Sequence, residues 1–167
     1  MQRLLVVAMC VVTFHVTSAC HAGSIFYVSP SGGHVVPFAT WNDAATNIQS
    51  AVTAALDNDI IMVSNGVYSG FGALHHGSNV VAIDKVLSLI GIAGPAQTMI
   101  DGGNAFRCLR IRSGVLVQGF TLANGAAATG GAVYCYYGGT LENCTVVDSA
   151  ARIGGGVFLD HGGIVTN

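Results

Sequence analysis

Arginine, tyrosine, phenylalanine and aspartate recur at a fixed spacing in the second half of the chain. Two columns with a 24-residue spacing collect the candidate binding residues: Arg110, Tyr134 and Phe158 in one, and Arg112, Tyr136 and Asp160 in the other. Aromatic rings pack against the apolar face of a sugar, and guanidinium groups pair with carboxylates or donate hydrogen bonds to hydroxyls. The columns therefore predict a carbohydrate-binding face. The alternative is a solvated face whose stacked rings stabilise neighbouring strands.

Other chemistry-bearing residues are sparse. Asp148 and Asp160 are expected at different corners of the fold, so no close carboxylate pair for glycosidic acid–base chemistry is apparent. His75 and His76 precede a glycine and are expected on a solvated loop. Cys108, Cys135 and Cys144 match no zinc spacing and are interpreted as buried apolar thiols. The sequence thus predicts no metal site and no cofactor.

An internal repeat must position the two columns. Residues 130–143 read GGAVYCYYGGTLEN and residues 154–167 read GGGVFLDHGGIVTN, an offset of 24, while residues 86–91 align with residues 114–119 at an offset of 28. Fixed periods in this range indicate a solenoid, and short strands separated by glycine favour a parallel β-helix. Each period is then one coil, with neighbouring coils about 4.8 Å apart. We therefore predict an all-β, right-handed parallel β-helix.

The repeat also separates the inward side chains from the residues at the corners. The columns expected to point inward are Leu109, Val133 and Val157; Ile111, Cys135 and Leu159; and Val117, Leu141 and Val165. Corner positions, given a structural role, are Gly131 and Gly155, with Asn143 and Asn167 as a stacked asparagine ladder that has Gly119 in the same slot.

Three segments are expected along the chain. Residues 1–22 have the charged, apolar and small-residue layout of a signal peptide, with lipidation of Cys20 as the less favoured alternative. Residues 23–59 are expected to hold an N-terminal strand and a capping helix over residues 44–56, begun by Asn42 or Asp43. Residues 60–167 form the coils, which we expect to continue beyond residue 167. The protein is predicted to be exported, to the extracellular space or to the cell surface or outer membrane.

Charge and hydropathy exclude other partners. Only 8% of the residues are charged and the net charge is −2, which leaves no basic patch for nucleic acid. No apolar segment is long enough to span a membrane as a helix, so no integral span is expected in the mature chain.

The chain resembles the pectin-lyase-like superfamily of right-handed parallel β-helix proteins. The resemblance rests on residues 27–32, the helical segment with residues 61–68, and a coil over residues 115–125. A weaker likeness to polymorphic outer-membrane protein repeats rests on residues 130–133 and 154–157. The superfamily includes lyases and glycosidases as well as adhesins, so the fold alone does not select the activity. In its lyases an arginine can abstract a proton beside a bound calcium, so the resemblance implies calcium only for an enzyme.

These observations favour an exported, non-catalytic surface scaffold or adhesin-like module whose partner is a polysaccharide or cell-surface glycan. The alternative is the N-terminal part of a polysaccharide lyase or glycoside hydrolase.

Overall fold

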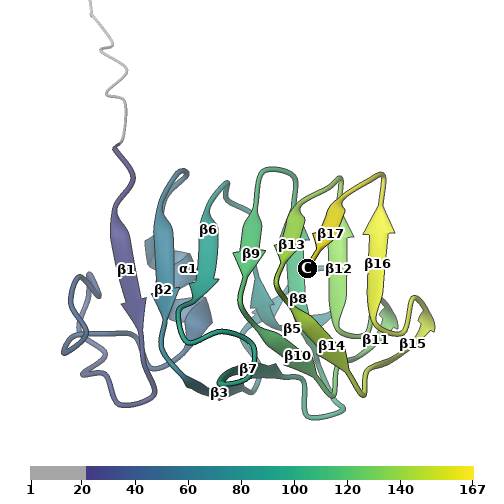
Figure 1. The fold of residues 1–167 in the computed structure, drawn as a ribbon, viewed down its shortest axis with the longest axis horizontal. Coiled ribbons are helices and arrows are strands. Elements are labelled where there is room, and N and C mark those ends of the chain that lie inside the picture. The colour runs from purple at the N-terminus through teal and green to yellow at the C-terminus, as the bar shows by residue number, and fades with distance from the viewer. Residues whose placement is uncertain (1–21) are drawn as a thin grey trace, which may run out of the picture.

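The computed structural model describes residues 22–167, which form a parallel β-solenoid of about four turns. Residues 1–21 of the predicted signal segment, Cys20 included, lie outside the described residues. From residue 22 onward, no helix is long and apolar enough to cross a membrane. The strands succeed one another along the long axis, from purple at the N-terminal end to yellow at the C-terminal end (Figure 1).

Four sheets make the walls of the solenoid. Sheet A contains β1 (Ile25–Val28), β2 (Ile60–Val63), β6 (Ser88–Gly91), β9 (Leu116–Gln118), β13 (Thr140–Glu142) and β17 (Ile164–Thr166). Sheet B contains β3 (Gly66–Ser69), β7 (Thr98–Asp101), β10 (Thr121–Ala123) and β14 (Thr145–Val147). Sheet C contains β4 (Ala73–Leu74), β5 (Ser78–Ala82), β8 (Arg107–Arg112), β12 (Val133–Tyr136) and β16 (Val157–Asp160). Sheet D pairs β11 (Ala126–Thr129) with β15 (Ala150–Ile153).

The register of the strands confirms the predicted repeat. In sheet C, Val133 pairs with Leu109 on one side and Val157 on the other, which is the 24-residue offset. In sheet A, Leu89 pairs with Val117, which is the earlier offset of 28. Each period is therefore one turn of the solenoid, as the sequence predicts.

The inward columns fill the core, but their last members are only partly covered. Leu109, Val133 and Cys135 are fully buried, whereas Leu159 is 41% and Val165 is 54% exposed. Both lie in the final turn, where no strand of the described chain lies over them. The alternation of side chains along a strand determines which residues point inward. Such a residue is fully buried only where a coil lies on each side of it.

The helix is shorter than predicted. It spans α1 (Ile48–Ala54), and Asn47 begins it by accepting a hydrogen bond from the Ser50 amide at 2.8 Å. The predicted start at residue 44, capped by Asn42 or Asp43, is wrong because Ala45 is extended and pairs with Val28 of β1. The apolar spacing that includes Ala45 fits a buried strand beside β1 as well as it fits the apolar stripe of a helix.

The N-terminal end of the solenoid is closed by side-chain and backbone contacts. Helix α1 contacts β1, β2 and β5 (Figure 1). The Gln49 side chain accepts from the Ala82 amide at 2.8 Å and donates to the Ala82 carbonyl at 3.3 Å, as an adjacent strand would. Lys85 donates to the helix carbonyls of Val52 and Thr53 at 3.0 and 2.8 Å. The edge of sheet C is thus covered at this end.

Candidate functional site

The predicted columns come together on the outer face of sheet C. Strand pairing places Tyr134 between Arg110 and Phe158, and Tyr136 between Arg112 and Asp160. The rings of Tyr134 and Phe158 are stacked, with centroids 5.7 Å apart and planes at 13°. The Tyr136 ring lies 6.2 Å from that of Tyr134. The aromatic members therefore form a continuous surface across two turns.

Tyr134 belongs to a polar chain that ends at a histidine. Its hydroxyl donates to Asp160 Oδ2 at 2.7 Å, and Asp160 Oδ1 lies 2.7 Å from His161 Nδ1. Loss of solvent around the phenol, followed by the hydrogen bond and charge of Asp160, raises the pKa of Tyr134 to about 12. The His161 ring stacks on Tyr137 at 4.6 Å. Tyr134 is therefore a neutral donor at physiological pH, and both oxygens of Asp160 have a partner.

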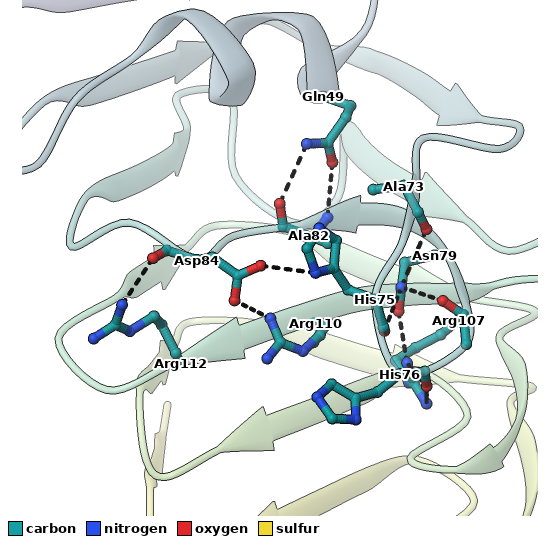
Figure 2. Close-up of polar contacts among 11 residues, drawn as sticks. Gln49, Ala73, His75, His76, Asn79, Ala82, Asp84, Arg107, Arg110 and Arg112 are labelled. Carbon is teal, nitrogen blue, oxygen red and sulfur yellow. Dashed lines mark hydrogen bonds and ion pairs between the residues drawn. The ribbon is translucent and has the colours of Figure 1, made fainter.

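A hairpin turn folds over these strands. Residues 75–77 join β4 to β5, and the His76 ring stacks on Tyr136 with centroids 5.4 Å apart. The side-chain amide of Asn79 donates to the carbonyls of His75 and Gly77 at 3.0 and 2.8 Å and so shapes the turn. His75 and His76 are both exposed in this turn, as the sequence predicts, although the His76 ring also contacts Tyr136 of sheet C (Figure 2).

Arg107 fastens this turn to the opposite corner. Its guanidinium donates to Asn79 Oδ1 at 2.6 Å and the His76 carbonyl at 3.3 Å, and to the carbonyls of Thr129 and Gly130 at 2.9 and 3.0 Å. Arg107 is 2% exposed, and burial lowers its pKa. Sequence reasoning missed this residue because the positions one and two periods later, 131 and 155, are glycines, so no column of similar side chains marks it.

Arg110 is buried beneath the same hairpin. It is 3% exposed and forms an ion pair with the Asp84 carboxylate, whose other oxygen lies 3.1 Å from His75 Nδ1. Arg112 is exposed and donates to the Asp84 carbonyl at 2.9 Å (Figure 2). Asp84 was missed, although the 28-residue offset applied to Arg112 leads directly to it.

Two hollows divide the predicted residues between them. A cleft of about 610 Å³ lies between the face of sheet C and the small side chains of β11, with Arg107, Tyr134, Phe158 and Asp160 in its wall. Arg110, Arg112 and Tyr136 line a separate cavity of about 250 Å³. The six predicted residues are therefore neighbours on one face, but they do not share one pocket.

The predicted structural residues differ in their roles. Asn143 has a φ of 46° and occupies the same corner as Gly119, whose φ is 82°. Across residues 22–167 no hydrogen bond joins the side chains of Asn143 and Asn167, and the left-handed backbone conformation is shared by Asn143 and Gly119. Gly131 is required by close approach, because a Cβ there would lie 2.2 Å from the Gly155 carbonyl oxygen.

The described residues offer little for a metal. No three histidine, cysteine, aspartate or glutamate side chains gather as a metal site within residues 22–167. The Asp101 carboxylate near the corner between sheets B and D instead accepts from the Asn124 side chain at 3.0 Å.

Comparison with protein-family models, curated proteins and solved structures finds no match to this chain.

Proposed function

We propose that this chain is an exported, non-catalytic module of the pectin-lyase-like superfamily that binds carbohydrate in the cleft beside sheet C. The observation that carries the proposal is the stacked pair Tyr134 and Phe158 in the wall of that cleft, with the Asp160 carboxylate beside them. Flat aromatic surfaces accept the apolar face of a pyranose, and a few fixed polar groups then orient the ring.

The chemistry of the cleft favours binding over catalysis. Asp160 is the carboxylate in the wall, whereas glycosidic acid–base catalysis uses two. A raised pKa makes Tyr134 a poor base, because it loses its proton only well above neutral pH. Arg107 is held among carbonyl groups rather than presented to a substrate. These groups form a rigid surface with defined hydrogen-bond directions, as a lectin-like scaffold requires.

The test is glycan binding by the purified chain and by matched aromatic variants. Phe158→Ala removes one stacked ring, and we expect the dissociation constant for the best glycan of a neutral and acidic panel to rise about five- to tenfold. The control is Phe71→Ala, since Phe71 is 58% exposed and lies outside the cleft. Calorimetry or affinity electrophoresis gives the two constants.

Equal binding by both variants, or no binding to any glycan, would contradict the proposal. Time-dependent appearance of shorter or unsaturated sugars would support the enzymatic alternative instead.

A further inference from the structure

The smaller cavity beside the cleft is distinguished by its polar lining. It measures about 250 Å³ and is lined by Asp84, Arg110, Arg112, Ser113, Tyr136 and Tyr137. Figure 2 shows the Asp84 side chain directed to Arg110 and His75, with Arg112 on the backbone side of Asp84. The cavity therefore lies at the end of β8, which supplies both arginines, between Asp84 of the preceding turn and Tyr136 of the following one.

Arg110 carries a buried donor without a protein partner. Its Nη1 is paired with Asp84, and its guanidinium carbon lies 5.3 Å from the centroid of the Tyr136 ring. Its Nε is buried and has no hydrogen-bond partner among the described residues. A buried unsatisfied donor on a charged group costs free energy, and an acceptor that reached this guanidinium from the cavity would offset that cost.

Around this cavity, hydrogen-bond donors without a protein partner outnumber acceptors without one. Arg112 is exposed, and the one hydrogen bond that its side chain makes within residues 22–167 goes to the Asp84 carbonyl. The hydroxyls of Ser113, Tyr136 and Tyr137 make no hydrogen bond to a described residue. The Asp84 carboxylate, in contrast, already faces Arg110 and His75 with its two oxygens. The cavity thus fits a group that accepts several hydrogen bonds.

The charges around the cavity also favour a ligand that accepts hydrogen bonds. Two arginines face one aspartate here, whereas the chain as a whole carries a net charge of −2. A guanidinium presents its N–H groups in a planar fork that matches a carboxylate or sulfate, and pairs of this kind are stronger than neutral hydrogen bonds. A local excess of positive charge on an acidic molecule favours an anion at this place.

We propose that the cavity is an oxyanion seat that holds one carboxylate or sulfate group of the glycan bound on Tyr134 and Phe158. The inference rests on the proposed function for the identity of the ligand, but the seat itself can be tested without it. Tyr134 and Tyr136 lie on one face of β12 with their centroids 6.2 Å apart, so cleft and seat can serve adjacent parts of one ligand. The glycan is then an acidic one.

The direct test titrates the purified chain with sodium sulfate, with glucuronate and with glucose at constant ionic strength. Nitrogen-15 NMR of the arginine side chains follows the Nε–H signals of Arg110, Arg112 and Arg152. We expect a saturable shift of the Arg110 signal with sulfate or glucuronate, and none with glucose. A response to sulfate indicates a sulfated sugar and one to glucuronate a uronic acid. No saturable shift, or an equal shift at Arg152, overturns the seat.

Matched charge variants provide the second measurement. Arg112→Gln should weaken oxyanion binding about tenfold or more, since it removes a charged donor. Arg152→Gln removes the same charge from an exposed arginine of β15 that lines neither hollow, and it should change binding less than about twofold. If Arg112→Gln unfolds, Tyr137→Phe removes one hydroxyl alone and should weaken binding about threefold. Equal effects of the two arginine variants contradict the proposal.

The two proposals fail in different ways. If sulfate or glucuronate binds at Arg110 but no glycan responds to Phe158→Ala, the carbohydrate function fails and the seat stands. If a glycan responds to Phe158→Ala but binds Arg112→Gln as well as the unchanged chain, the seat fails and the function stands.

Discussion

The exposure and the pKa of individual side chains in this protein depend on the residues that cover them. Arg110 faces outward from β8, yet it is 3% exposed, since it pairs with Asp84 and its guanidinium carbon lies 5.3 Å from the centroid of the Tyr136 ring. Cys108 and Cys135 are fully buried, and loss of solvent raises the pKa of each thiol to about 12. The predicted burial is confirmed for Cys108 and Cys135, whereas Cys144 is only partly buried against the core, and none of the three forms a disulfide.

The thiols provide a prediction at this scale. The thiolate is the reactive form, and at pH 9 only about one in a thousand of a thiol with a pKa of about 12 is ionised. We expect alkylation of Cys108 and Cys135 at pH 9 to be at least about a hundredfold slower in the folded chain than in urea. Mass spectrometry of iodoacetamide-labelled peptides measures the rates. Rapid labelling of Cys135 in the folded chain would show that its pKa is ordinary.

At the scale of elements, the corners of the coils depend on how closely neighbouring backbones approach. At Gly131, a Cβ would lie 2.2 Å from the Gly155 carbonyl oxygen and 2.6 Å from that of Ala150. At Gly155, one period later, the nearest atom is the Ser149 carbonyl oxygen at 3.3 Å. Two glycines in the same column of the repeat therefore have different reasons for being glycine.

Paired substitutions test this difference. We expect Gly131→Ala to lower the free energy of unfolding by about 2–3 kcal/mol, because backbone must move to admit the methyl group. Gly155→Ala serves as the control and should cost about 1 kcal/mol or less. Urea denaturation followed by circular dichroism measures both. Equal losses would mean that the repeat position, not the contact, determines the cost.

On the scale of the whole molecule, the two ends of the solenoid are unequal. The first coils are covered by α1, by Gln49 and by β4, which pairs with β5. In the last coil of the described chain, Leu159, Ile164 and Val165 are 41%, 56% and 54% exposed. Because a solenoid is stabilised by contacts between neighbouring coils, a polypeptide made of residues 22–167 alone should lose stability toward its last coil.

Hydrogen exchange of the purified chain should show this gradient. We expect the amides of β16 and β17 to exchange at least about tenfold faster than those of β8 and β9. The covered strand β5 is the control for the opposite end and should exchange at a rate close to that of β8. Exchange at one rate from β5 to β17 would show instead that the coils open as a single unit.

The sequence by itself determined the coil, because a 24-residue period with alternating apolar positions specifies which residues stack and which face of each strand is buried. It also placed Tyr134 over Phe158 and Arg112 beside Tyr136, since register follows directly from the period. Only the tertiary structure decided that Arg110 is covered, that Arg107 ties the His76 turn to a distant corner, and that the columns divide between a cleft and a cavity. Those features depend on the turn at residues 75–77, which lies outside the repeat. The 24-residue period therefore does not predict its contacts with sheet C.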